Sequence, residues 1–473
     1  MKAHGTPPRG ESSVVRSSLH EGRFGRMFRR LPPAPRYSEE QLAELADTMR
    51  EQVPTGWNAQ EPVLDGDNPD IPAGYTYFGQ LVDHDITFDP ASSLQRQNDP
   101  AALTDFRSPR FDLDSLYGSG PLDEPFQYER TNTPDSDPAR LLLGNNNNGE
   151  FDLPRTSEGL AIIGDPRNDE NIVVSQLHLA FARAHNGLAA QVAADTSVGD
   201  EQRFEETQRR LRWHYQWIIA HDYLPKVCGK KLIDELLIED EDGVVEIKRR
   251  YYRPENNPYM PVEFSVAGFR FGHSQVRPTY DLSAEVTERP IFAAGDDVGE
   301  FGDLRGFRPL PPRWTVDWRL FLKFDDTHTF QPSRLINSKL SDALFDLPGV
   351  PADDPRLHSL AFRNLLRGQV LDLPSGQDVA TLLKAPRVYT GADLSAPEPT
   401  PLWFYILKEA ELEEGNNGIR LGWTGGRIVA EVLLGLLEAD KKSWVNVSPG
   451  WKPTLPFAGE TFMLSDLVEF SGN

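Results

Sequence analysis

Most of the chain divides into segments whose apolar residues recur with the period of a helix. Residues 38–50 predict a short helix capped by Ser38, and residues 74–85 predict a buried helix with one polar face. A third helix has a clear start, because Asp165 can cap it and Pro166 fits its first turn. Further helices are expected at 201–224, 337–346, 355–367, 403–413 and 424–440.

The segments between these helices are long and rich in turn residues. Residues 89–150 and 285–335 carry no clear period, and strand signals are few and short. An irregular segment as long as 89–150 is usually functional or tied down by a metal. The length of 473 residues would allow two or three domains, but no Pro/Ser linker or internal repeat divides the chain.

The pattern therefore predicts a mainly α-helical fold with long ordered loops and little β structure. One catalytic domain is expected over residues 37–473. Residues 1–36 are rich in Pro, Gly, Ser and Arg without a period, which is typical of a flexible N-terminal arm.

Composition limits the classes of partner that the protein is expected to bind. Asp and Glu number 72 against 49 Lys and Arg, a net charge of −23, which argues against nucleic acid and anionic membranes as main partners. Cys228 is the one cysteine, so a disulfide framework is excluded. Residues 1–36 show no apolar core of a Sec signal, and the apolar stretch 428–437 is too short to span a bilayer. We expect a cytoplasmic protein or one exported without a Sec signal; the oligomeric state stays open.

The first segment with candidate chemistry is Phe78–Asp85. On a helix Gln80 and His84 share a face, while Asp83 and Asp85 point to either side of it. One turn can therefore offer a His/Gln pair to a pocket and a carboxylate to each flank. The alternative is a surface turn with a solvated acidic pair, against which the apolar neighbours argue.

The second segment, Ser108–Gly118, holds oxygen-bearing side chains at alternating positions. Ser108, Asp112 and Asp114 would face one side of an extended loop. Hard oxygen ligands of this kind suit Ca²⁺. The alternative is a polar turn next to a strand.

The third and fourth segments each place a polar residue in a distinctive context. In Gly164–Glu170, Arg167 and Glu170 share a face at a helix start, although an ordinary ion pair would look the same. In Phe269–Ser274, His273 follows a glycine that would let a flat group approach the backbone. The alternative for His273 is a satisfied core histidine.

The four segments, in this order, resemble the animal-type haem peroxidases of the peroxidase–cyclooxygenase superfamily. The shared motifs are Gly-Gln-x-x-Asp-His-Asp, a calcium loop ending in Tyr-Gly, Gly-Asp-x-Arg-x-x-Glu, and Phe-Gly-His. A further family element, Asn-x-x-Arg followed by Leu-Pro, is present from Asn364 to Pro374. The resemblance covers roughly residues 20–465 and implies a helical peroxidase fold, a haem b-derived cofactor and one structural Ca²⁺.

The resemblance implies roles on the peroxide side of the haem. His84 resembles the distal general acid–base, Arg167 the distal cation that polarises the O–O bond, and Gln80 the amide that orders water and positions a halide. Asp83 and Glu170 resemble the carboxylates that form ester links to haem.

It also implies a proximal side and a metal loop. His273 resembles the iron ligand and Asn364 the acceptor of its ring N–H, while Arg270 and Arg367 resemble residues at the haem propionates or pocket wall. The expected Ca²⁺ ligands are the side chains of Asp85, Ser108, Asp112 and Asp114 and the carbonyl of Arg110.

Three departures from the family pattern are visible. Asn171 stands where some members carry a Met that forms a sulfonium link to haem. Arg270 stands three residues before His273, where cyclooxygenases carry a radical tyrosine, and residues 368–371 replace the usual stretch after the Asn element.

The expected reaction is H₂O₂-dependent oxidation of small donors: iodide, bromide, thiocyanate or phenols. The alternatives are a fatty-acid dioxygenase of the same superfamily and a peroxidase-like scaffold without turnover. The helical histidines lack paired ligand geometry and are expected in the core, as is an inert Cys228; they are His178, His185, His214 and His221.

Overall fold

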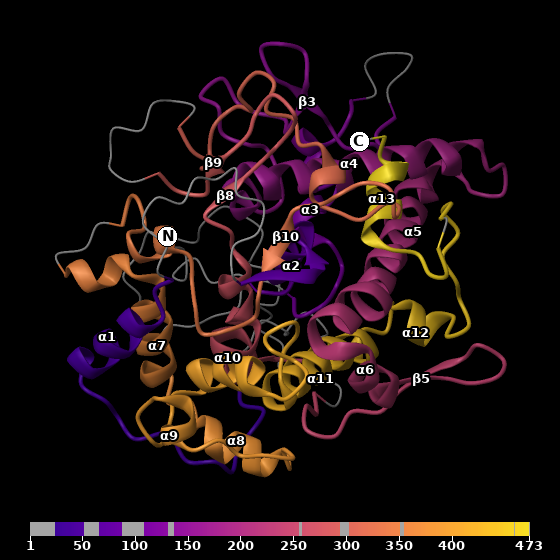
Figure 1. Ribbon diagram of the computed structural model, residues 1–473. Coiled ribbons are helices and arrows are strands. Elements are labelled where there is room, and N and C mark those ends of the chain that lie inside the picture. The colour runs from indigo at the N-terminus through magenta and orange to yellow at the C-terminus, as the bar shows by residue number, and fades with distance from the viewer. Residues whose placement is uncertain are drawn as a thin grey trace, which may run out of the picture.

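The computed structural model describes residues 24–51, 66–87, 108–130, 137–254, 258–293, 302–350, 354–457 and 459–472 (Figure 1). Its helices are α1 (Glu39–Thr48), α2 (Gly74–Ile86), α3 (Asp114–Tyr117), α4 (Ile172–Ala194), α5 (Arg203–Ile218), α6 (Lys230–Leu236), α7 (Leu360–Val370), α8 (Gly376–Leu382), α9 (Gly391–Leu394), α10 (Leu402–Leu412), α11 (Trp423–Ala439), α12 (Trp444–Val447) and α13 (Leu464–Phe470). The predicted mainly helical fold is confirmed.

Strands are short and occur in pairs within the described residues. The strands are β1 (Phe24–Gly25), β2 (Asp67–Pro72), β3 (Gly144–Asn145), β4 (Phe151–Asp152), β5 (Leu237–Glu239), β6 (Val245–Ile247), β7 (Met260–Pro261), β8 (Thr279–Tyr280), β9 (Arg289–Pro290) and β10 (Pro332–Arg334). β1 pairs with β7 in parallel, whereas β10–β2, β3–β4, β5–β6 and β8–β9 are antiparallel. Such short pairs fasten loops and build no continuous sheet.

The helix α2 lies near the middle of the molecule, with α4 and α5 to one side and α10 and α11 below it in Figure 1. It packs against α4, and α4 packs against α5 and α13. Buried apolar residues form one connected core that runs from Met27 to Val468. None of the described helices combines the length and apolarity needed to cross a bilayer.

Close backbone approach explains why α2 begins and continues with glycine. A Cβ added at Gly74 would come within 2.6 Å of the carbonyl oxygen of Phe321, and one at Gly79 within 2.5 Å of the Tyr223 hydroxyl. Both distances are shorter than van der Waals contact, so these two positions need a residue without a side chain. The helix that carries His84 is thereby held directly against its neighbours.

Two of the predicted helices are divided in the structure. The helix expected from Asp165 is a 3-10 turn, Pro166–Asp169, followed by α4, because both Asp165 and Asn171 are extended caps. Residues 201–224 form α5 only as far as Ile218 and continue as π-helical turns. Pro225 lies in this region and has no N–H to continue an α-helical ladder.

Two other predicted helices are also corrected. Residues 337–346 contain a 3-10 turn, Asp342–Phe345, and no α-helix. Residues 355–367 divide at Ser359, whose side chain caps α7. In the second case the Ser359 cap interrupts the apolar pattern that suggested one helix.

Part of the predicted N-terminal arm is packed against the domain. Met27 and Phe28 are buried, and Arg26 donates hydrogen bonds to the carbonyls of Leu371 (2.8 Å) and Asp372 (2.9 Å). Flexibility is therefore the wrong description for this part of the arm, whereas residues 1–23 lie outside the described residues.

Candidate active site

A cavity of about 340 Å³ lies between α2, the turn before α4, the segment around His273, and α7. This volume is within the range of ligand and cofactor sites. Most of the predicted chemistry-bearing residues line it: Gln80, Asp83, His84, Arg167, Glu170, Asn171, Arg270, His273, Asn364 and Arg367. Residues as far apart in sequence as Gln80 and Arg367, 287 positions, thus meet at one site.

His84 is buried and is held through one ring nitrogen. Its Nδ1 lies 2.8 Å from Oδ1 of Asn168, and Nδ2 of Asn168 lies 3.0 Å from Nδ1 of His178. Because the Asn168 amide nitrogen donates to His178, its oxygen accepts the proton on Nδ1 of His84. The Nε2 of His84 is left as the basic atom, 3.5 Å from Oε1 of Glu170.

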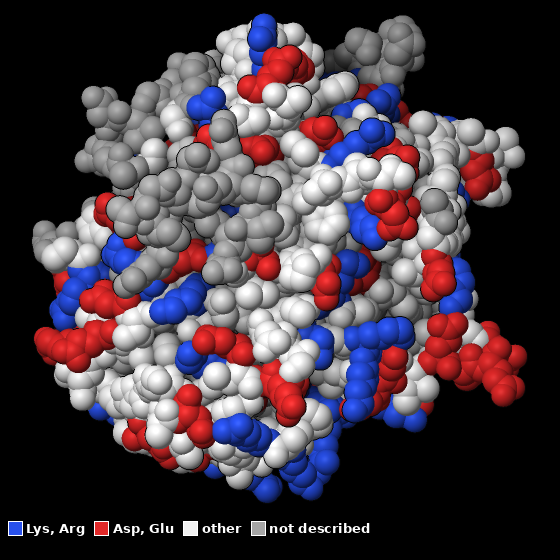
Figure 2. Space-filling model, in the orientation of Figure 1, with Lys and Arg blue, Asp and Glu red and all other residues white. Residues whose placement is uncertain are grey.

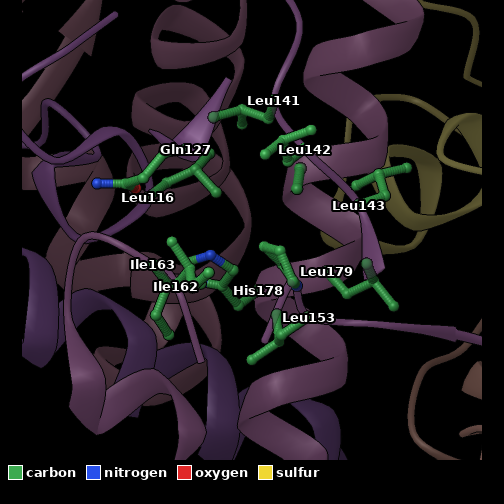
Figure 3. Close-up of a pocket in the computed structure, with 12 residues that line it drawn as sticks. Leu116, Gln127, Leu141, Leu142, Leu143, Leu153, Ile162, Ile163, His178 and Leu179 are labelled. Carbon is green, nitrogen blue, oxygen red and sulfur yellow. The ribbon is translucent and has the colours of Figure 1, made fainter. Parts of the chain in front are cut away.

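The environment of His178 supports this assignment. Burial lowers the pKa of His178 to about 4, so its ring is neutral and can accept a hydrogen bond. Figure 3 shows the ring among leucine and isoleucine side chains, including Leu116, Ile162 and Leu179. The space there is only about 10 Å³, at the lower limit for a single water. His178 is in the core, as expected from the sequence, but its link to His84 through Asn168 was not predicted.

Gln80 and Glu170 form a second polar network at the cavity. Nε2 of Gln80 donates to Oε1 of Glu170, and Nδ2 of Asn171 donates to Oε1 of Gln80 over 3.1 Å. Asn171 also caps α4, since its Oδ1 accepts from the Val174 amide. The network fixes the Gln80 amide beside His84 and so joins α2 to the start of α4.

Arg167 lines the cavity, but its guanidinium is already partnered. It pairs with Asp165 over 2.8 Å and donates to the carbonyls of His84 (3.1 Å) and Thr87 at the end of α2. Its charge therefore lies at the cavity wall and also closes the last turn of the helix that carries His84.

The second carboxylate predicted to contact haem is Asp83. It is partly exposed at the cavity, and its Oδ1 accepts from the Thr87 hydroxyl over 3.2 Å. Asp83 and Glu170 thus reach the same cavity from α2 and from the turn before α4.

His273 faces the cavity from the 3-10 segment Gly268–Gln275. Burial and the nearby charges of Arg270, Arg367 and Arg363 lower the pKa of His273 to about 3, so the ring is neutral. Its Nδ1 lies 2.8 Å from the Asn364 amide, with the amide nitrogen on the near side. For Asn364 to accept the ring N–H of His273, as predicted, its amide must be turned by 180°. This turn exchanges the amide nitrogen and oxygen, which have nearly the same shape.

The cavity fits a flat cofactor bound at His273. A Cβ added at Gly272 would meet no atom within 4 Å, so the backbone beside His273 borders open space. Arg270, Arg363 and Arg367 line the same cavity and provide cations for acidic groups at a cofactor edge. Arg363 was missed in the sequence, although it precedes Asn364 directly and lies four residues before Arg367 on the face of α7.

The predicted calcium loop lies next to the end of α2. Oδ2 of Asp85 accepts from the amide of Leu113 (3.1 Å), and Ser108 donates to Oδ2 of Asp112 (2.9 Å). Asp85 and Asp114 are buried. Within the described residues, however, His, Cys, Asp and Glu nowhere gather as three or more in a metal-holding arrangement.

Among the other helical histidines, His185 and His214 are buried, as is Cys228, whereas His221 is half-buried. Nδ1 of His185 is 2.9 Å from the Tyr117 hydroxyl, and Nε2 of His214 accepts from the amide of Thr454 over 3.0 Å. His221 stacks on Trp217 with ring centroids 3.7 Å apart. Burial raises the pKa of Cys228, which keeps the thiol protonated.

Comparison with known proteins agrees with the motifs. The animal haem peroxidase family model matches residues 111–297, which include Arg167, Glu170 and His273 and begin after His84. The chorion peroxidase of Drosophila melanogaster is 26% identical over 296 residues, covering 59% of this chain and 34% of the relative. The chain spans about a third of the length of the first curated relatives it matches.

Solved structures share the fold. Peroxidase A from Dictyostelium discoideum superposes with a TM-score of 0.68 at 16% identity, covering 100% of this chain and 98% of the other. A fatty acid alpha-dioxygenase from Arabidopsis thaliana gives a TM-score of 0.58 at 15% identity over 99% and 81%. The ordered motifs, the family match over residues 111–297 and this shared fold make the chain similar to the animal-type haem peroxidases of the peroxidase–cyclooxygenase superfamily.

Proposed function

We propose that the protein is a haem peroxidase that uses H₂O₂ to oxidise small donors. One observation carries the proposal: two histidines, His84 and His273, line one cavity, and each has its Nδ1 held by an asparagine. The Nε2 atom of each ring remains for chemistry in the cavity. A non-catalytic scaffold would not need this arrangement on both sides.

The cofactor would be held by residues already described. His273 would bind the iron through Nε2, and Arg270, Arg363 and Arg367 would pair with the propionates. When bound, haem supplies the redox-active iron at which the O–O bond of the peroxide is cleaved and through which the donor is oxidised. Asp83 and Glu170, both at the cavity, are our candidates for ester links to the cofactor.

The protein's own contribution on the peroxide side is proton transfer. With its proton at Nδ1 directed to Asn168, His84 presents a lone pair at Nε2. Nε2 takes the proton from one peroxide oxygen and delivers it to the other, which leaves as water. Gln80 orders water or a small anion beside this atom, and Arg167 contributes positive charge at the wall.

We further propose a structural Ca²⁺ bound by Asp85, Ser108, Asp112, Asp114 and the Arg110 carbonyl. The support is the proximity of these oxygens to the end of α2, next to His84 in sequence. A cation there would hold the end of the helix that carries the proton-transfer residue.

The test is an absorption spectrum of the purified protein before and after addition of H₂O₂, followed by steady-state turnover with iodide, bromide, thiocyanate and phenols. A Soret band that changes with peroxide, together with donor turnover, supports the proposal. A protein that expresses without haem and cannot be reconstituted contradicts it.

A fatty-acid dioxygenase is the second candidate, because Tyr77 and Tyr223 line the cavity and could donate an electron there. Arg270 occupies the sequence position where a cyclooxygenase has its tyrosine. Oxygen consumption with a long-chain fatty acid, measured without added donor, separates this activity from peroxidase turnover.

A further inference from the structure

A second cavity, of about 770 Å³, lies apart from the haem cavity and shares no lining residue with it. We call it the arginine groove. One wall is the N-terminal segment 24–30, and the other is formed by residues around Tyr251 and Tyr259, with Leu382 at the edge. Four arginines line it: Arg26, Arg29, Arg30 and Arg253.

The charge of the groove departs from the rest of the protein. The chain has 23 more acidic than basic residues, and Figure 2 shows both signs interspersed over the visible face. Among the described residues that line the groove, none is Asp or Glu. Within the described parts of the chain, none of its four arginines forms an ion pair with a carboxylate.

Three of the four guanidinium groups, those of Arg26, Arg29 and Arg253, contact uncharged partners. Arg26 donates to the carbonyls of Leu371 and Asp372, and Nε of Arg253 donates to the carbonyl of Arg250 over 3.0 Å. Arg29 lies 5.8 Å from the centre of the Tyr259 ring. Carbonyls and rings orient a guanidinium without neutralising it, and arginine stays charged at any physiological pH.

One carboxylate, that of Glu263, does lie close to the groove. The buried carboxylate of Glu263 accepts from the amides of Met27 (3.0 Å) and Phe28 (3.2 Å), and Arg26 attracts it at longer range. One buried carboxylate does not balance four arginines, so the groove keeps a positive potential. Arg29 and Arg30 are exposed and can reach a ligand, while Arg26 is anchored deeper.

We propose that the arginine groove binds a small multivalent oxyanion, a molecule with several phosphate or carboxylate groups. Guanidinium forks match both groups through paired hydrogen bonds. A single-charge anion would leave most of the four cations without a partner, so valence is the main determinant of affinity. The site is independent of peroxide chemistry.

The groove also adjoins the elements that carry the proximal residues. Glu263 opens the π-helical turn Glu263–Ala267, which leads directly into the segment of His273. Arg26 is bound to the carbonyls that follow α7, the helix of Asn364. An occupant would therefore stiffen the segment that ties these two elements together and raise the melting temperature.

The experiment is calorimetric titration of the full-length protein as isolated, without peroxide, at about 50 mM salt, where screening is moderate. The probes are tripolyphosphate and citrate, with inorganic phosphate as the low-valence comparison and heparin as a long polyanion. We expect saturable binding of at least one of the two multivalent probes, at least about tenfold tighter than phosphate. Which of the two binds identifies phosphate or carboxylate as the preferred group.

The variant is Arg29→Gln/Arg30→Gln, in two exposed side chains, and we expect it to weaken binding about tenfold or more. The matched control is Arg313→Gln/Arg319→Gln, also exposed and with the same change in net charge. Absence of saturable binding, an equal loss in the control, or binding of heparin alone would overturn the proposal. None of these outcomes depends on whether the protein is a peroxidase.

Discussion

Oδ1 of Asn168 lies 2.8 Å from Nδ1 of His84, and this contact determines which nitrogen of the histidine is basic. Asn168 is itself oriented by His178, whose neutral ring accepts from the amide nitrogen. Tautomer selection by a buried polar partner is a common way to prepare a histidine for proton transfer.

Asn168→Leu keeps the side-chain size but removes the acceptor, so the proton of His84 is no longer directed to Nδ1. We expect the rate of reaction with H₂O₂ to fall on the order of 10–100-fold, with haem content unchanged. Stopped-flow absorbance at the Soret band measures this rate. Asn168→Asp retains an acceptor oxygen, so its rate should lie between those of the wild type and Asn168→Leu. A wild-type rate in Asn168→Leu would show that the contact has no role.

Substitution of the two cavity histidines should have different effects on haem binding and on the reaction with H₂O₂. His273→Ala removes the proposed iron ligand and should lose haem or bind it weakly. His84→Ala should retain haem and react with H₂O₂ about 10²–10⁴-fold more slowly, because only a proton carrier is lost. Haem-to-protein ratio and stopped-flow rate check the pair. A normal histidine-ligated spectrum in His273→Ala would refute the assignment.

Much of this site could be predicted from local sequence, because its motifs are local. Gln80 and His84 share a helical face by spacing alone, and Asp165 and Pro166 mark the turn that holds Arg167. The cap of α4 was expected at Asp165 but is Asn171. Both residues are good caps, and only packing decides whether one continuous helix or a turn followed by a helix forms.

The missed residues depend on contacts that sequence spacing does not encode. Asn168 meets His84 across 84 positions, and His178 looks like any other apolar-flanked helical histidine. Arg363 did carry a signal, its i, i+4 relation to Arg367, which gains meaning only once α7 is known to face the cavity. The π-helical turns after Ile218 have no periodic signature.

Removal of Ca²⁺ is the next test. Asp85, Asp112 and Asp114 are acidic residues of one region, and without a cation their charges would repel. Prolonged chelation should lower the melting temperature and the peroxidase activity together, because Asp85 lies in the last turn of the helix that carries His84. Metal analysis of active protein is the direct control, and active protein free of calcium would exclude the site.

Covalent attachment of haem follows from the positions of Asp83 and Glu170 at the cavity. We expect acid–acetone extraction to leave haem on the chain, at least after cycling with H₂O₂. Asp83→Asn and Glu170→Gln, separately and together, should release it progressively, which the haem absorbance of the precipitated protein measures. Complete extraction from cycled wild-type protein would contradict the prediction.

The last prediction concerns the donor. Asn171 occupies the position where some relatives carry the methionine of a sulfonium link, and its amide is hydrogen-bonded to Gln80 over 3.1 Å. An amide cannot form that link, so the haem should lack the electron withdrawal that the link provides. Chloride is the hardest halide to oxidise and should therefore be a poor donor.

The net charge of −23 disfavours all anionic donors alike and so favours the neutral phenols, although screening at physiological salt limits its reach to about 8 Å. We expect iodide, bromide, thiocyanate and phenols to be oxidised ahead of chloride. Steady-state turnover with each donor at about pH 5–7 tests the order. Asn171→Met is the matched variant, and a gain in its chloride oxidation relative to bromide would support the role of Asn171. Wild-type turnover of chloride at the rate of bromide would refute the prediction.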